Sequence, residues 1–174
     1  MIPFREAGAR VESHIARRYG IAVVTRAVGG GFVGDLDGAE IRIDPSSTGE
    51  QRLFLLAHLF GHTVQWNTDE VAFELGQPQT PPVREDVLPS LLAYEREAAS
   101  YGLAILQEAS AGPVEPWYSD YSACDLRYLM HYYQTGEKGD FRGFWRDASP
   151  PLRLKVIPPF QPVRRMFRAA GVVI

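Results

Sequence analysis

The sequence has very little cysteine, no long apolar run and no strong excess of either charge. Cys124 is the only cysteine in the 174 residues, so neither an intrachain disulfide nor a zinc site built from thiolates can form. No apolar run is long enough to cross a bilayer, and the first residues lack the apolar core of a signal peptide. We therefore expect a protein of the cytoplasm that has no membrane association.

The charge balance does not favour direct binding to nucleic acid. The net charge is −3 and the pI is about 5.8, so no overall field draws the chain to nucleic acid or to an anionic membrane. Basic residues gather at Arg17–Arg18 and Arg164–Arg168, where we expect solvated faces. With 45% hydrophobic and 22% charged residues, the composition is that of one globular domain over residues 1–174.

The first quarter of the chain changes from helical to strand periodicity. Apolar residues at helical spacing predict a helix over residues 4–19, and the β-branched run Ile21–Val24 predicts a short strand. The Asp37-Gly38 pair predicts the turn of a hairpin whose strands are Phe32–Val33 and Ala39–Ile43. A helix, a strand and a hairpin are therefore expected in this order.

The rest of the chain is predicted to be mainly helical. The pattern Ser47-Thr-Gly-Glu50 matches a capping box directly before the apolar run Leu53–Phe60, which predicts a helix over residues 48–66. Residues 67–88 are polar, carry three prolines and are expected to form a loop. The remaining expected elements are a helix over residues 89–108, a helix from Asp120 or Ser122 to Thr135, one or two turns over Phe141–Arg146, an irregular stretch over Ser149–Pro162 and a short basic helix over Val163–Ala170.

Two histidines lie four residues apart in the segment Leu56-Ala-His-Leu-Phe-Gly-His62. In a helix, His58 and His62 project from the same face, with their β-carbons about 6 Å apart. They flank the apolar stripe that is expected to face the core, where an unpaired polar ring is costly to bury. Two imidazoles at this spacing can share one metal ion, and zinc binds neutral histidine readily. Surface rings or hydrogen-bonded rings are the alternative.

The helix expected over residues 89–108 supplies a candidate third ligand. Glu95 shares a helix face with small and apolar residues, namely Leu91, Ala98, Ala99, Gly102 and Leu106. A carboxylate on such a face needs a cation or a strong hydrogen-bond partner. Glu97 falls on a more mixed face and is expected to be solvated, so it is the reserve candidate. Two histidines and one carboxylate, with water in the fourth position, form a known type of catalytic zinc site.

The order of these elements, with RIDPSSTGEQRLFLLAHLFGH followed by YEREAASYGLAIL, resembles the ImmA/IrrE family of zinc-dependent peptidase-like proteins. The resemblance covers about residues 5–108; members carry HExxH on one helix and an ExEAxxFA-like pattern on a later one. It implies a minimal zincin-like α+β fold, in which a small, mostly antiparallel sheet packs against a helical bundle that carries the HxxxH helix. It also implies that His58, His62 and Glu95 bind zinc, with Glu97 in reserve. Residues 113–174 then form a helical and proline-rich extension.

Leu59 stands where the family motif has its glutamate. That glutamate removes a proton from the zinc-bound water, and leucine can neither accept a proton nor orient water. General-base assistance typically contributes about 10²–10⁴ in rate, so ordinary peptidase activity is not expected. Asp69, Glu70 and Glu74 follow the helix as candidate substitutes, and the sequence does not fix their positions.

His131 and Tyr132, on the helix that ends at Thr135, are further candidates. They could line the site or donate hydrogen bonds to a developing oxyanion. The alternative is an aromatic core that contains one satisfied histidine.

Three functional hypotheses follow from these observations. The first is a degenerate zinc-metallopeptidase-like protein that binds metal, or a protein partner such as a transcriptional regulator or a peptide, without ordinary peptidase activity. The second is an active zinc-dependent hydrolase or peptidase that uses a non-standard general base. The third is a metal-free α+β interaction protein whose histidine pair is structural.

Overall fold

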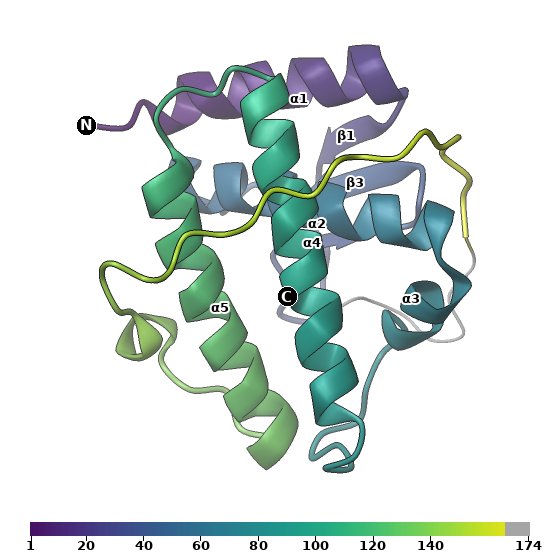
Figure 1. Cartoon of the computed structure of the whole chain (residues 1–174), viewed down its shortest axis with the longest axis vertical. Coiled ribbons are helices and arrows are strands. Elements are labelled where there is room, and N and C mark those ends of the chain that lie inside the picture. The colour runs from purple at the N-terminus through teal and green to yellow at the C-terminus, as the bar shows by residue number, and fades with distance from the viewer. Residues whose placement is uncertain (166–174) are drawn as a thin grey trace.

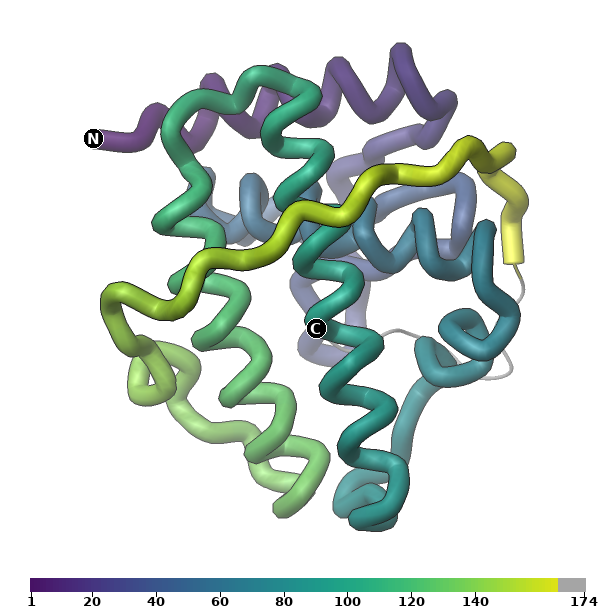
Figure 2. Tube along the Cα trace, in the orientation of Figure 1, coloured from purple at the N-terminus to yellow at the C-terminus, as the bar shows by residue number. Residues whose placement is uncertain are grey.

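The structure, a computed structural model, describes residues 1–165 and has an α+β fold of helices around one small sheet (Figure 1). After the last helical turn, the chain runs as an irregular segment over residues 145–165, which crosses α5 and α4 on the face seen in Figure 2. Among residues 1–165, no helix is long and apolar enough to cross a membrane. The elements are α1 (Phe4–Tyr19), β1 (Ala22–Thr25), β2 (Gly34–Leu36), β3 (Glu40–Ile43), α2 (Gly49–Thr68), α3 (Glu70–Leu75), α4 (Leu88–Glu108), α5 (Glu115–Thr135) and the 3-10 turn η1 (Phe141–Phe144).

β3 is the central strand of the sheet and pairs with β1 on one side and β2 on the other. β2 and β3 form an antiparallel hairpin at the predicted Asp37-Gly38 turn, where Gly38 has a φ of +93° that favours glycine. Its first strand is Gly34–Leu36 rather than the predicted Phe32–Val33. β1 runs parallel to β3. The expectation of a mostly antiparallel sheet is therefore wrong, and the sheet is mixed. Residues 26–33 lead from β1 to β2, which lies two strand positions away in the sheet. β3 then occupies the position between them and pairs with both.

α2 begins with a capping box that lies one residue later than the predicted one. Thr48 Oγ1 accepts a hydrogen bond from the backbone N–H of Gln51 at 3.2 Å, and Gln51 Oε1 accepts one from the backbone N–H of Thr48 at 2.9 Å. Glu50, the predicted partner of Ser47, instead accepts hydrogen bonds from the side chains of Trp117 and Arg142. This use of Glu50 ties the start of α2 to α5 and η1.

α2 is the central helix of the fold. Every residue from Leu53 to Trp66 is buried, because other elements cover the helix on all sides. α1, β2 and β3 contact α2, and so does α4 along much of its length. The main apolar cluster joins these elements through fully buried side chains such as Val11, Ile41 and Leu56. A buried central helix can hold polar side chains away from water, and this is where both candidate histidines lie.

α3 lies inside the stretch 67–88 that the sequence predicts as a loop. Asp69 caps this short helix by accepting a hydrogen bond from the backbone N–H of Val71 at 2.9 Å. Phe73 packs edge-on against Trp66 of α2, with ring centroids 5.3 Å apart. The prediction was wrong here because a tertiary contact, rather than a strong helical period, holds these few residues.

α5 begins earlier than predicted, at Glu115 rather than at Asp120 or Ser122. Pro116 fits the first turn of a helix, where no backbone N–H is required. The irregular stretch predicted over Ser149–Pro162 is present. Of the predicted final helix over Val163–Ala170, the first three residues are irregular and the others lie outside the described residues.

Candidate metal centre

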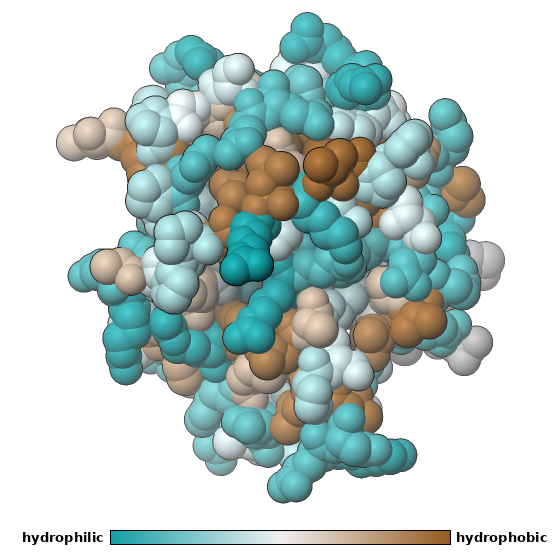
Figure 3. Space-filling model, in the orientation of Figure 1, coloured by the Kyte–Doolittle hydropathy of each residue, from teal (hydrophilic) through white to brown (hydrophobic). Residues whose placement is uncertain are grey.

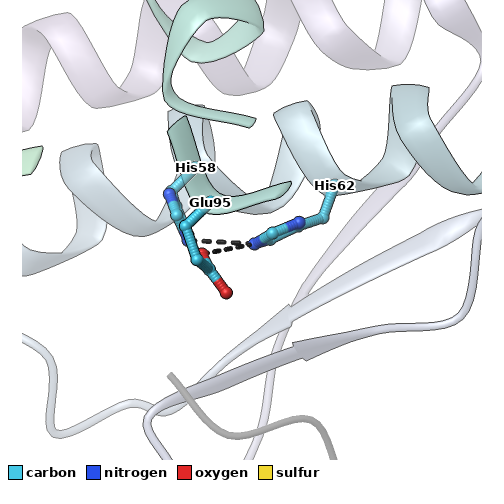
Figure 4. Close-up of side chains that lie close together, drawn as sticks. All are labelled: His58, His62 and Glu95. Atoms are coloured by element: carbon cyan, nitrogen blue, oxygen red, sulfur yellow. Dashed lines mark hydrogen bonds and ion pairs between the residues drawn. The ribbon is translucent and has the colours of Figure 1, made fainter. Parts of the chain in front are cut away.

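His58, His62 and Glu95 come together at one buried point between α2 and α4 (Figure 4). The two histidines lie one turn apart on α2, with their Nε2 atoms 3.0 Å from each other. Glu95 reaches them from α4, and its Oε2 atom lies 3.2 Å from each Nε2. All three side chains are at most 7% exposed. A buried group of two imidazoles and one carboxylate whose donor atoms converge in this way could hold a metal ion.

The α2 and α4 backbones approach each other closely beside this cluster. Gly61 lies between the two histidines in the chain, and a β-carbon added there would collide with the carbonyl oxygen of Ala98. At Gly102, an added β-carbon would lie 2.9 Å from the carbonyl oxygen of Ala57. These glycines let α4 lie close enough to α2 for Glu95 to reach both rings.

Gln65 orients the ring of His62. Its Oε1 atom lies 2.9 Å from His62 Nδ1, while its Nε2 donates hydrogen bonds to the backbone carbonyl of Tyr94 and to a carboxylate oxygen of Glu97. Because the amide nitrogen already faces two acceptors, the amide oxygen must accept from an N–H at His62 Nδ1. This fixes the tautomer in which His62 Nε2 carries the free electron pair, as metal-binding histidines require.

The cluster has fewer protons than it needs for hydrogen bonds among its two Nε2 atoms and the carboxylate oxygen. In its neutral form, His62 directs an electron pair towards both His58 and Glu95, so electron-pair donors face one another. The buried Nδ1 atom of His58 has no hydrogen-bond partner among residues 1–165, so nothing in that range fixes its tautomer. Its ring stacks on Phe54, with centroids 5.2 Å apart. A neutral His58 with its proton on Nε2 can donate it to only one of the other two atoms, so a further proton or a metal ion would complete the cluster.

The electrostatics of Glu95 favour its ionised form. Burial raises the pKa of this carboxyl, but the charges of His62 and His58 in their protonated forms, together with hydrogen bonds from these rings, outweigh burial and lower the pKa to about 2. The carboxylate is therefore charged at neutral pH, even though it is buried. A charged oxygen next to two imidazoles provides the negative charge that a bound cation requires.

A cleft of about 660 Å³ lies between α4 and α5 and reaches the cluster. His58 and Glu95 line it, and residues 150–153 of the irregular segment form part of its wall. His62 does not line the cleft, because its ring is stacked on Tyr94 with centroids 4.5 Å apart. The volume is in the range of small-molecule sites. An ion held by the three side chains would therefore be open to the cleft on one side.

The other predicted candidates have different positions. Glu97, the reserve ligand, accepts a hydrogen bond from Gln65 and forms an ion pair with Lys155, so it supports the cluster from outside. His131 lines the cleft, with its ring 5.4 Å from that of Phe144. Tyr132 does not line it and packs in a separate apolar cluster around Leu91.

None of the acids considered as substitutes for the motif glutamate lines the cleft. Asp69 caps α3, and Glu70 forms an ion pair with Arg165. Glu74 lies in the last turn of α3. Leu59 itself is fully buried and packs towards β2, where its Cδ1 atom lies 3.0 Å from the β-carbon position of Gly34. Position 59 therefore faces the sheet rather than the cleft.

The sequence analysis missed Asp125, a buried carboxyl of α5 that lines the same cleft. Tyr121, one turn earlier, stacks on Phe54 at 4.2 Å, and Leu129, one turn later, lies in one apolar cluster with Leu91. Phe54 lies one turn before His58 on α2, and Leu91 lies one turn before Glu95 on α4. The contacts of Tyr121 and Leu129 therefore place Asp125, which lies between them on α5, opposite these two side chains. Its position on the apolar face of α5, as an isolated acid, is the signal that could have found it.

The pKa of Asp125 is raised to about 7, chiefly by burial; the nearby charge of His58 opposes the rise, and that of Glu95 adds to it. Asp125 is not one of the donor groups that lie within 4.8 Å of one another, so it stands apart from the three convergent side chains. The cleft therefore combines a possible cation site with a separate carboxyl that can gain or lose a proton near neutral pH.

No family model matches the chain, and neither a curated protein nor a solved structure matches it.

Proposed function

We propose that the protein is a zinc-binding protein of the metallopeptidase type, in which His58, His62 and Glu95 hold the ion. The observation that carries this proposal is the triangle of donor atoms, with edges of 3.0, 3.2 and 3.2 Å. Tetrahedral zinc, with ligand bonds of about 2.0–2.2 Å, separates its ligand atoms by about 3.4 Å. Two imidazoles and one carboxylate fit this ion in number, in chemistry and nearly in spacing.

The site is of the catalytic rather than the structural type. Structural zinc sites are closed by four protein ligands, whereas catalytic sites have three and leave one position open. Here three side chains converge, and two of them line the cleft. When bound, zinc would supply a Lewis acid and lower the pKa of water at that position.

The role that we favour is that of a binding or regulatory module without ordinary peptidase activity. Leu59 removes the motif glutamate, and its contact with β2 leaves no room near the cleft for a residue at that position to act as a base. The resemblance to ImmA/IrrE proteins supports a protein or peptide partner, such as a transcriptional regulator. The single cysteine favours a reducing compartment such as the cytoplasm.

Zinc titration of the metal-free protein tests the site. We expect one zinc per chain by calorimetry, and we expect Glu95→Gln and His58→Ala each to weaken binding by at least about 100-fold, because each removes one of three ligands. Glu85→Gln and His14→Ala are matched controls that change the same residue types outside the cluster. The proposal fails if zinc does not bind, or if the controls weaken binding as much as the ligand variants.

Asp125 favours a second candidate function, an active hydrolase with a non-standard base. Its carboxyl lines the cleft opposite His58 and Glu95, at a position from which it could accept a proton from a water molecule in the cleft. This role would replace that of the absent motif glutamate.

A cleavage assay with casein, before and after chelation, separates the two functions. Chelator-sensitive cleavage that falls by about 10²-fold or more in Asp125→Asn supports the hydrolase. Asp140→Asn, which changes an exposed aspartate outside the cleft, is the control. Zinc binding without cleavage supports the binding module.

A further inference from the structure

Three arginines from three different segments line the cleft beside the candidate metal centre. Arg96 belongs to α4, Arg127 to α5 and Arg153 to the irregular segment that follows η1. Arg127 is held in place, because its Nη1 atom donates a hydrogen bond to the backbone carbonyl of Phe144 at 3.2 Å. None of the three guanidinium groups forms an ion pair with a carboxylate of residues 1–165.

Arginines with and without an ion pair both occur elsewhere in residues 1–165, and Arg5, Arg17, Arg18 and Arg146 also form none. The chain has a net charge of −3, so acidic side chains are plentiful. Arginines of several other regions use them in ion pairs, namely Arg42 with Asp35 and Asp37, Arg52 with Glu12, Arg142 with Glu50 and Arg165 with Glu70. What distinguishes the cleft is that three guanidinium groups without an ion pair, from three separate segments, gather around it.

The acids inside the cleft do not neutralise these arginines. Two carboxyl groups line it, and Glu95 is already engaged by the two histidines. The other, Asp125, lies opposite those histidines and forms no ion pair with any of the three arginines. Figure 3 shows strongly hydrophilic side chains between apolar ones at the centre of this face, over α4 and α5. The cleft therefore has an excess of positive charge even before a cation binds.

The lining of the cleft also indicates the size and character of its ligand. A guanidinium group presents a planar pair of N–H donors that matches the oxygens of a carboxylate or a phosphate. Leu92, Met130 and Leu152 line the same cleft and offer apolar contact to the rest of a ligand. A ligand that carries an oxyanion on an otherwise partly apolar body fits both kinds of surface.

We propose that the cleft binds a ligand through a carboxylate or phosphate group, which Arg96, Arg127 and Arg153 hold beside the metal centre. This inference rests on the proposed function, because it names the chemistry of what that site recognises. The arginines bind the oxyanion and orient the ligand, and the apolar wall contacts its body. The irregular segment contributes to recognition by placing Arg153, through backbone N–H bonds from Ser149 to Asp120 and from Leu152 to Ser119.

Calorimetric titration of the zinc-loaded protein with two probes, succinate and inorganic phosphate, tests the inference. We expect saturable binding of at least one probe in the millimolar range or tighter, and the stronger probe tells whether carboxylate or phosphate is preferred. Arg96→Gln, Arg127→Gln and Arg153→Gln should each weaken this binding by about 10-fold, since a hydrogen bond to a charged group is lost. Arg5→Gln, which removes an exposed arginine outside the cleft, should leave it unchanged.

The inference is overturned if neither probe binds saturably, or if Arg5→Gln weakens binding as much as the cleft variants do. Zinc affinity is measured for the same four variants. Failure of the proposed function appears as absence of zinc binding by the wild type, whereas failure of this inference appears as normal zinc binding without probe binding. We expect all four variants to fold, because these positions are at the surface or half-buried. Circular dichroism spectra check this.

Discussion

The two long interfaces of α4 differ sharply in how closely the helices approach. Against α2, the backbones meet at Gly61, where an added β-carbon would collide with the carbonyl oxygen of Ala98, whereas at Gly102 an added carbon would meet both Ala57 of α2 and the hydroxyl of Tyr118 on α5. Against α5, the same helix leaves a cleft of about 660 Å³. The first interface brings ligands from two helices to one point, and the second gives a small molecule access to that point. Close packing around the three side chains and access to them are thus provided by two different interfaces of one helix.

The largest effect is expected from a change that forces the close interface apart. Gly61→Ala should destabilise the fold by roughly 3 kcal/mol, because the added methyl group overlaps a backbone atom that cannot rotate away. Chemical denaturation measures this loss, and zinc affinity should fall with it because Glu95 moves away from the histidines. Gly8→Ala is the matched control: its added carbon would meet Leu56 at an ordinary 3.9 Å. Equal stability of the two variants would disprove the close contact.

A change on the side of α2 that faces the sheet should destabilise the fold almost as much. Leu59→Glu restores the motif of a zinc peptidase, but it places an unpaired charge in the core beside β2. We expect a loss of about 3 kcal/mol and no gain in hydrolysis, since the new carboxylate does not face the cleft. Leu154→Glu, at an exposed leucine, should cost little. A folded Leu59→Glu variant that gains chelator-sensitive activity would contradict the orientation described for this side chain.

The buried carboxyl of Asp125 at the α4–α5 interface should make the stability of the protein depend on pH. The folded-state pKa of Asp125 is raised from about 3.8 to about 7, so the folded protein binds an extra proton between these values. Its contribution to stability is therefore lost as the pH rises from 4 to 7. In the metal-free protein, the stability of Asp125→Asn relative to wild type should increase by roughly 2 kcal/mol between pH 5 and pH 8. Denaturation at both pH values measures it, and a pH-independent difference would contradict the buried position.

The smallest effect is expected at the edge where the irregular segment lies on α4. Lys155 forms an ion pair with Glu97, but both side chains are partly exposed, at 47% and 31%. Lys155→Gln should therefore change stability by less than about 1 kcal/mol and leave zinc affinity unaltered, as thermal unfolding and titration would show. A large loss of zinc affinity would mean that Glu97 controls the cluster through Gln65.

The convergence of the three candidate side chains could be predicted because their signals are local. The spacing of His58 and His62 defines a common helix face, and Glu95 is an acid among small apolar residues on the helix over 89–108. The structure brings all three together. Three of the four long helices, α1, α2 and α4, were also predicted to within two residues at each end, since strong periodicity marks them.

What the sequence did not predict depends on contacts between distant residues. The parallel pairing of β1 with β3 depends on how residues 26–33 cross the sheet, and no short pattern encodes that path. α3 depends on the packing of Phe73 against Trp66. Asp125 lies within the predicted helix and was missed because its importance depends on its position opposite two other helices.

The path of the irregular segment has a consequence for synthesis of the protein. Residues 150–153 complete the wall of the cleft, and a little further on Val163 donates its backbone N–H to Asn67 on α2, while Arg165 donates to Asp37 near β2. A ribosome makes these residues after every helix and strand they contact. The nascent chain can therefore bring the two histidines and Glu95 together before the wall of the cleft is complete.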